Sequence, residues 1–124
     1  MPDLQKRRRA HRWGINAEKL AGWYLRGKGY RILAGRSRNA LGEIDILAKR
    51  GNTLAAIEVK ARKTWEECET SVAPWKQQRI ARAMEMWLAQ SSTLAGEQNC
   101  AIRFDVIWMT PWRWPRHIKD AWRP

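Results

Sequence analysis

Apolar side chains recur at the helical spacing i, i+3, i+4 and i+7 in two segments of the chain. This spacing predicts a first helix over residues 17–28, with Asn16 as its N-cap and Gly29 as its C-terminal stop. A second helix is predicted to begin at Pro74, because proline suits the first helical turn. The predicted apolar faces are Ala17, Leu20, Ala21 and Tyr24 in the first helix and Ile80, Ala83, Met84, Trp87 and Leu88 in the second.

Shorter apolar runs without helical spacing predict strands at residues 30–34, 43–49, 53–62 and 101–109. Gly51 and Asn52 tolerate positive φ and predict a tight hairpin turn between the second and third strands. Residues 63–73 have no periodicity and are interpreted as a loop, and a last short strand near residues 117–120 has weaker support. The order αβββαβ predicts a mixed α/β domain, with a mixed β-sheet flanked by helices.

The predicted hairpin brings acidic and basic side chains together. A two-residue loop at 51–52 places Asp45 opposite Glu58 and Glu43 opposite Lys60. Because strand side chains alternate between faces, these four residues share one face of the sheet. The opposite face, which is expected to pack on a helix, carries Ile44, Ile46, Ile57 and Val59.

This polar face predicts a metal site. Two carboxylates about 4 Å apart repel by roughly 4 kcal/mol at an effective dielectric near 20, and like charges opposite each other destabilise a sheet. A divalent cation offsets that repulsion, and Mg²⁺ prefers oxygen ligands. We therefore expect Asp45 and Glu58 to hold Mg²⁺ or Mn²⁺, with Lys60 orienting or deprotonating the attacking water or stabilising charge on phosphate. The alternative is an ordinary surface strand lined with ion pairs, Glu43–Lys60 among them.

Three further polar residues have alternative interpretations. Glu18 joins the candidate metal ligands if its helix packs by the hairpin, and otherwise favours the helix dipole in the first turn. Asp105 interrupts an apolar run, and we expect it to face solvent or to have a structural role rather than to support the metal site. His117 is isolated in the sequence, as is His11, and a structural role is favoured for both.

Composition limits the chain to one domain and points to a polyanionic partner. The 124 residues carry 24 Lys and Arg against 12 Asp and Glu, for a net charge of +12. The excess is concentrated in the first 38 residues, so residues 1–12 are interpreted as a mobile basic arm and residues 13–124 as one domain. Such charge favours nucleic acid over a membrane surface as the partner. The side chains expected to contact phosphate are Arg36, Arg38, Arg62, Lys76 and Arg79.

The sequence gives no sign of export. No run approaches the roughly 18 apolar residues that span a bilayer, and the basic N-terminus lacks the apolar stretch of a signal peptide. Cys68 and Cys100 are neither paired in a CxxC motif nor near a histidine pair, so they are interpreted as reduced thiols. We expect a cytoplasmic protein that does not act on membranes.

Nine tryptophans are unusual for a chain of this length. Trp23 and Trp87 fall on or beside helix faces and are expected in the core. Trp112 and Trp114 alternate with arginines near the C-terminus. These two either stack on unpaired bases or close one end of the sheet, and the sequence does not favour one of the two alternatives.

Two motifs at a defined separation connect these candidates to a known family. The segments Gly42-Glu43-Ile44-Asp45-Ile46 and Glu58-Val59-Lys60-Ala61-Arg62 look like those of the YraN family of bacterial proteins. Further similarities lie at Gly14, Glu18, Tyr30 to Leu33, Lys76 to Arg79 and Arg103 to Val106, so the resemblance covers roughly residues 13–122.

The resemblance implies a restriction-endonuclease-like fold, similar to the PD-(D/E)xK nucleases and, among them, to archaeal Holliday junction resolvases. It assigns Asp45, Glu58 and Lys60 to the catalytic motif and Glu18 to an additional metal ligand on the first helix. Glu43 is expected beside these ligands without binding the metal. Ile44 occupies a position near the proline of the nuclease motif, which is absent here.

The function implied is a metal-dependent endonuclease acting on DNA, including branched or structured DNA. The alternative is a nucleic-acid-binding module that uses the nuclease scaffold without catalysis. A symmetric substrate would favour a homodimer. The family is itself largely uncharacterised, so the fold and the metal site carry over better than any substrate does.

Overall fold

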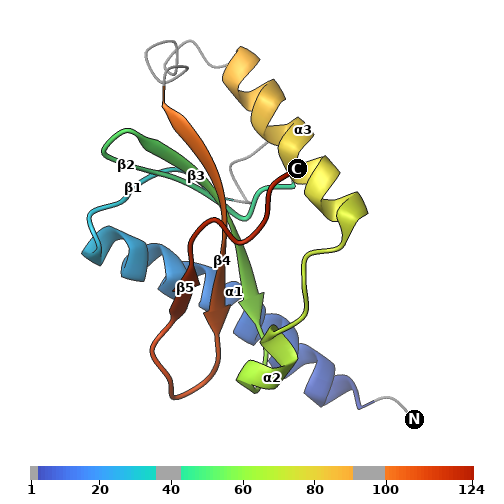
Figure 1. Ribbon diagram of the computed structural model, residues 1–124. Coiled ribbons are helices and arrows are strands. Elements are labelled where there is room, and N and C mark those ends of the chain that lie inside the picture. The colour runs from blue at the N-terminus through green and yellow to red at the C-terminus, as the bar shows by residue number, and fades with distance from the viewer. Residues whose placement is uncertain (1–2, 36–42, 91–99) are drawn as a thin grey trace.

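A computed structural model describes residues 3–35, 43–90 and 100–124 of the chain. It contains eight elements, ordered αβββααββ along the chain (Figure 1). The helices are α1 (Leu4–Gly27), α2 (Trp65–Cys68) and α3 (Pro74–Gln90), and the strands are β1 (Arg31–Gly35), β2 (Ile46–Arg50), β3 (Thr53–Ala61), β4 (Ala101–Met109) and β5 (Arg116–Ile118).

The strands form one sheet in the order β1-β2-β3-β4-β5. All neighbours are antiparallel except β3 and β4, which are parallel and are connected through α2 and α3. This mixed sheet flanked by helices confirms the predicted fold class and is compatible with a restriction-endonuclease-like fold. Two short elements add to the predicted order: α2 lies inside the segment predicted as a loop, and β5 lies where the last strand had weaker support.

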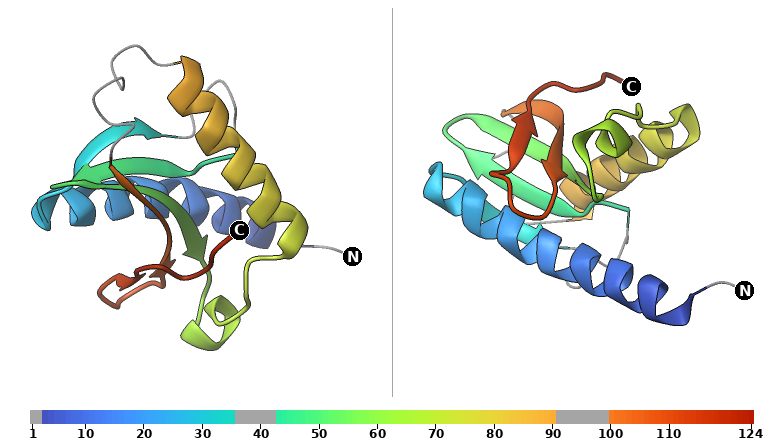
Figure 2. Two further views of the ribbon diagram at one scale, coloured as in Figure 1. Left: turned by 45° about the horizontal axis from the view of Figure 1, so that its top comes forward. Right: turned by 90° about the horizontal axis from the view of Figure 1, so that it is seen from below.

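Helices α1 and α3 lie on opposite faces of the sheet (Figure 2), and the buried apolar residues form two clusters, one under each helix. On one face α1 packs Ala17, Ala21 and Leu25 against the sheet. On the other face α3 packs against the sheet through the five apolar residues predicted for it, three of them buried and two partly buried. Within the described ranges no helix is long and apolar enough to cross a membrane.

Helix α1 is longer than predicted. It begins at Leu4, and the Asp3 carboxylate caps it by accepting hydrogen bonds from two backbone N–H groups, so the prediction of Asn16 as the N-cap is wrong. Residues 4–12, interpreted as a mobile arm, form its exposed first turns, and their separation from the domain at residues 13–124 stays a prediction. Leu20 and Trp23 were expected on or beside the apolar face, but they are exposed.

The β2–β3 hairpin has the predicted register. Arg50 pairs with Thr53 around the two-residue turn, and the ladder continues to the pair Ile46 and Ile57. Gly51 has φ of +58°, as the turn requires. The ladder stops at Ile46, so residues 43–45 lie before the strand and not in it. Ile44 consequently packs in the cluster on the α3 side, whereas it was predicted on the opposite face with Ile46 and Ile57.

Candidate functional site

Asp45 and Glu58 are brought together at the end of the hairpin ladder. Glu58 lies in β3, and Asp45 is the last residue before β2. The backbone N–H of Val59 donates a 2.9 Å hydrogen bond to Asp45 Oδ2, which fixes the Asp45 side chain against β3. Both carboxylates are buried, with Asp45 4% exposed and Glu58 9% exposed. The pairing predicted from the sequence is therefore preserved, although Asp45 lies just beyond the strand.

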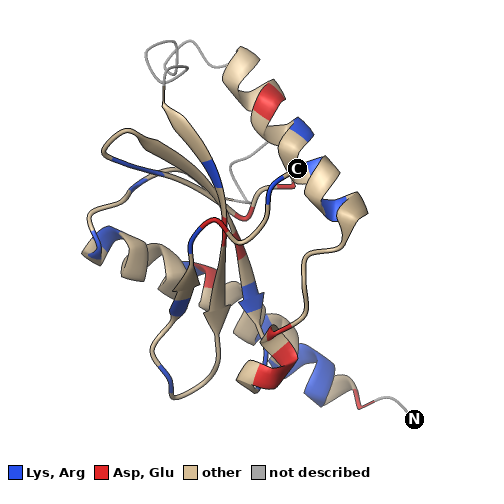
Figure 3. Cartoon of the chain, in the orientation of Figure 1, with Lys and Arg blue, Asp and Glu red and all other residues tan. Residues whose placement is uncertain are grey.

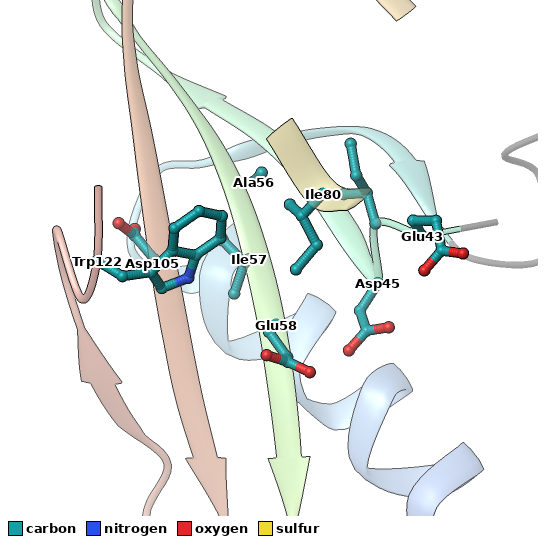
Figure 4. A pocket seen from close by; sticks show the side chains of 9 residues that line it. Glu43, Asp45, Ala56, Ile57, Glu58, Ile80, Asp105 and Trp122 are labelled. Carbon is teal, nitrogen blue, oxygen red and sulfur yellow. The ribbon is translucent and has the colours of Figure 1, made fainter. Parts of the chain in front are cut away.

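The two side chains border a small hollow between the sheet and α3 (Figure 4). The carboxylates of Asp45 and Glu58 point toward a common space, and Glu43, two residues before Asp45, lies at the rim. The space in and in front of the hollow, open solvent included, is about 190 Å³. Ile80 of α3 and Trp122 near the C-terminus contribute its apolar walls.

Glu58 has one partner and one unpartnered oxygen. Its Oε1 forms an ion pair with Lys76 Nζ on α3. Its Oε2 is buried and has no hydrogen-bond partner in the part of the chain that the structure describes. An unpaired buried carboxylate oxygen is costly, so this atom is suited to binding a cation.

Lys60 is held beside this pair by the segment after β3. It is 7% exposed, and its Nζ donates to Cys68 O at 3.3 Å and to Thr70 Oγ1 at 3.2 Å. Burial lowers the pKa of Lys60 below its usual 10.5, and the charge of Glu58 offsets only part of that effect. No pattern in the sequence predicted the Thr70 contact, because residues 63–73 lack periodicity.

Glu43 does not pair with Lys60 as predicted. Because the chain leaves the sheet before Ile46, the alternation of faces does not extend to Glu43, and its carboxylate lies 3.6 Å from Arg79 Nη1 on α3. The interpretation of Glu43–Lys60 as a cross-strand ion pair is therefore wrong. The expectation that Glu43 lies next to the candidate ligands without joining them stays a prediction.

Glu18 lies on α1, half-buried and next to Ala17, which packs against the sheet. In residues 3–35, 43–90 and 100–124 no group of three or more His, Cys, Asp or Glu side chains is arranged to hold a metal ion. The assignment of Asp45 and Glu58 as metal ligands stays a prediction, and so does that of Glu18 as a third ligand.

The basic residues expected to contact phosphate differ in their surroundings. Arg36 and Arg38 lie outside the described residues. Arg62 is exposed and donates to the carbonyl of Ala61. Lys76 and Arg79 form ion pairs with the acidic residues of the site, so they are placed at the site and not on a separate surface. The structure does not test whether any of them binds phosphate.

Asp105 forms a separate buried network. Its carboxylate accepts two 2.8 Å hydrogen bonds from Arg103 and one of 2.9 Å from the backbone of Asp120, and His117 Nε2 lies 2.7 Å away. Arg103 also donates to Tyr30 Oη. Burial alone would raise the pKa of Asp105, but hydrogen bonds with His117 and Arg103 outweigh burial and lower it.

The network has a structural role. It joins β4 to β5 and to the segment after α1, and in Figure 4 the Asp105 carboxylate points away from the pair formed by Asp45 and Glu58. The structural interpretations of Asp105 and His117 are therefore confirmed, and exposure of Asp105 to solvent is excluded. Cys68 and Cys100 are both free thiols, also as predicted.

The chain matches the model of the uncharacterised protein family UPF0102 over residues 17–109. A UPF0102 protein of Paramagnetospirillum magneticum is 45% identical over 98% of this chain and 95% of its own length. Two further relatives have the same family description. A protein of Rhizobium meliloti is 43% identical over 97% of this chain and 95% of its own length. A protein of Bartonella tribocorum is 42% identical over 95% of this chain and 88% of its own length. The expected relation to an uncharacterised bacterial family is confirmed, and the relation to nucleases stays a prediction.

Proposed function

We propose that this chain, which belongs to the uncharacterised protein family UPF0102, is a metal-dependent endonuclease that hydrolyses phosphodiester bonds in DNA. The observation that carries the proposal is the pair of buried carboxylates, Asp45 and Glu58, which point toward a common space, with the charge of Glu58 acting on the nearby Lys60. A fold compatible with restriction-endonuclease-like proteins agrees with it.

The residues present fit a divalent metal ion. Two carboxylates, completed by water and a substrate phosphate, are a common ligand set for Mg²⁺. The unpartnered Glu58 Oε2 supplies a buried anionic oxygen of the kind such an ion requires. Glu18 is included as a third ligand, approaching from α1. When bound, the ion would polarise the scissile phosphate and lower the pKa of a bound water.

Lys60 would act on the reacting groups directly. Its ammonium group has three N–H donors, and in the described chain two of them are directed to Cys68 and Thr70. The third can donate to a phosphate oxygen or orient the attacking water. Because both anchoring contacts fix Nζ, the donor is preorganised, which is what makes electrostatic stabilisation of a transition state effective.

The charge distribution supports DNA as the substrate. The net charge of +12 attracts polyanions, and chromosomal DNA is the polyanion we expect the protein to meet in the bacterial cytoplasm. Residues 4–12 form a basic, exposed stretch of α1, and further basic residues lie on α3 (Figure 3). These groups would contact phosphates, with Arg62, Lys76 and Arg79 nearest the carboxylates. A symmetric branched substrate would favour a homodimer.

The test is cleavage of a panel of linear duplex, single-stranded and four-way-junction DNAs with Mg²⁺ or Mn²⁺. Asp45→Asn and Lys60→Ala are expected to abolish cleavage, and Glu85→Gln, an exposed carboxylate on α3, serves as the matched control. Calorimetric titration with Mn²⁺ should show binding that Asp45→Asn weakens. Cleavage that survives both Asp45→Asn and Lys60→Ala would exclude this site as the active centre.

A second function is favoured by the ion pair between Lys76 and Glu58. Because Lys76 already neutralises this carboxylate, the same residues would also suit a DNA-binding module without catalysis. That function predicts salt-sensitive DNA binding without metal. For each phosphate contacted, the logarithm of the affinity should fall by about 0.9 for every tenfold rise in salt concentration. Asp45→Asn would then leave DNA binding unchanged or strengthen it, and no member of the panel would be cut.

A further inference from the structure

The turn between β4 and β5 exposes two tryptophan side chains. Trp112 is 102% exposed and Trp114 is 84% exposed. They do not close one end of the sheet, which was one of their two predicted roles. Indole rings are usually well buried, and two fully or largely exposed ones in a single short turn are a candidate interaction site.

The backbone of this turn holds Trp112 in an unfavourable conformation. Its φ is +68°, in the left-handed region that residues other than glycine rarely adopt. Such conformations persist where the surrounding structure imposes them, and they concentrate at functional sites. The outward position of this indole is therefore a feature of the turn's backbone and not only of a side-chain rotamer.

Two arginine side chains, Arg113 in the same turn and Arg116 at the start of β5, pack over two other tryptophans. The Arg113 guanidinium carbon lies 4.8 Å from the ring centroid of Trp65, and that of Arg116 lies 5.4 Å from Trp65 and 5.2 Å from Trp108. Trp65 and Trp108 contact each other edge to face, with centroids 6.2 Å apart. These four residues form an aromatic–arginine cluster. Both arginines remain exposed, so the cluster is cationic at its surface.

The cluster is continuous with the candidate active site. Trp108 is the neighbour of Lys60 across the parallel β3–β4 ladder, and Arg116 is the neighbour of Trp108 across the β4–β5 ladder. Residues opposite each other in neighbouring strands share a face. Lys60, Trp108 and Arg116 therefore form a row on one face of the sheet, which leads from the candidate site toward the turn at the same end of the molecule as α2 (Figure 1).

We propose that the β4–β5 turn binds unpaired nucleotides, with Trp112 and Trp114 stacking on bases and Arg113 and Arg116 contacting phosphates. In a duplex the faces of the bases are already stacked, so two outward indoles distinguish unpaired from paired strands. The proposal rests on the proposed function for its partner, DNA. It identifies the substrate class as DNA with a single-stranded segment next to the cleaved bond.

The test measures DNA binding in EDTA, where cleavage cannot contribute. Fluorescence anisotropy compares a single-stranded oligonucleotide, a blunt duplex, and a duplex with a single-stranded overhang. Trp112→Ala with Trp114→Ala should weaken binding of the single strand and the overhang by roughly 5- to 150-fold per lost stacked base. Affinity for the blunt duplex should stay nearly the same. The matched control is Trp23→Ala, which removes an indole that is 73% exposed on α1.

The outcomes separate this inference from the proposed function. Equal losses for all three DNAs, no loss at all, or the same loss in Trp23→Ala would overturn the binding site. Binding of the turn to anionic phosphatidylserine vesicles in place of DNA would overturn it as well. Selective loss with no cleavage under any metal condition would retain the binding site and reject the nuclease. Cleavage without a selective loss of binding would retain the nuclease and reject the binding site.

Discussion

Lys76 on α3 forms an ion pair with Glu58 on β3, across the edge of the hollow that Asp45 and Glu58 border. The lysine thus neutralises one of the two carboxylates that we assign to a metal ion. If an ion binds there, Lys76 competes with it for Glu58 Oε1. Once released, the lysine would be free to contact the substrate phosphate.

This competition predicts opposite effects of Lys76→Gln on metal and on DNA. Removing the ammonium group should strengthen Mn²⁺ binding by several-fold, because an attraction of about 1 kcal/mol or more no longer has to be broken. DNA binding should weaken, since one phosphate contact is lost. Calorimetry and anisotropy measure the two effects, with the exposed Arg82→Gln on the same helix as control. Unchanged Mn²⁺ affinity would show that the ion does not compete with Lys76 for Glu58.

Lys60 should contribute to activity at a cost in stability. Burying an ammonium group is unfavourable because the group loses its hydration, and Met, which has a similar length, removes that cost together with the two hydrogen bonds of Nζ. Lys60→Met is therefore expected to keep or raise the free energy of unfolding by about 1 kcal/mol, while cleavage falls by about 10²- to 10⁴-fold. Urea unfolding and single-turnover cleavage test this. A strongly destabilised variant would indicate that Lys60 serves mainly to anchor Cys68 and Thr70.

The Asp105 network should make stability depend on pH in the acid range. The pKa of Asp105 in the folded protein is below its ordinary 3.8, so its contribution is complete above the unfolded pKa. It is lost as the pH falls below 3.8 through the folded value. Asp105→Asn should cost about 3–5 kcal/mol at neutral pH, because the half-buried Arg103 loses its carboxylate partner and keeps only Tyr30. The deficit should shrink toward pH 3.

Urea unfolding of both proteins between pH 3 and pH 7 measures that deficit. The exposed Asp120→Asn is a suitable control because it also removes a carboxylate paired with an arginine, Arg123. If Asp105→Asn does not fold, the milder His117→Gln should show the same trend with pH. A deficit that is independent of pH would contradict the lowered pKa of Asp105.

The first turns of α1 should be stabilised by DNA. Residues 4–12 are exposed, so no packing supports them. Their positive charges also lie at the positive end of the helix dipole, which is unfavourable. Their amides should exchange with solvent roughly tenfold or more faster than those of residues 17–25. Duplex DNA should slow the exchange of residues 4–12 selectively. Uniform exchange along α1, before and after DNA is added, would show that these turns do not bind it.

The sequence predicted local features of the fold well. The hairpin register follows from a two-residue turn and from alternation, both of which involve neighbouring residues, so it was correct for every pair from Ile46 and Ile57 to the turn. The α3 face was also correct. The start of α1 was predicted wrongly, because residues 4–12 are exposed and lack the apolar periodicity on which the prediction rested.

The remaining features depend on contacts between distant segments. Alternation predicted a partner for Glu43 only as long as the strand continued, and the end of the β2 ladder cannot be inferred from alternation. Thr70 reaches Lys60 from a segment without periodicity. The burial of Asp105 requires Arg103, Tyr30 and His117 to converge, and no pattern along the chain predicts that.

The hydrogen bond from Val59 N to Asp45 has a consequence for the order of folding. It connects residues only 14 apart in the chain, whereas the contact between Arg103 and Tyr30 connects residues 73 apart. Closing the longer loop costs roughly 1.5 kcal/mol more in chain entropy. We therefore expect the carboxylate pair to assemble with its hairpin early, before β4 joins the sheet and before the Asp105 network can form.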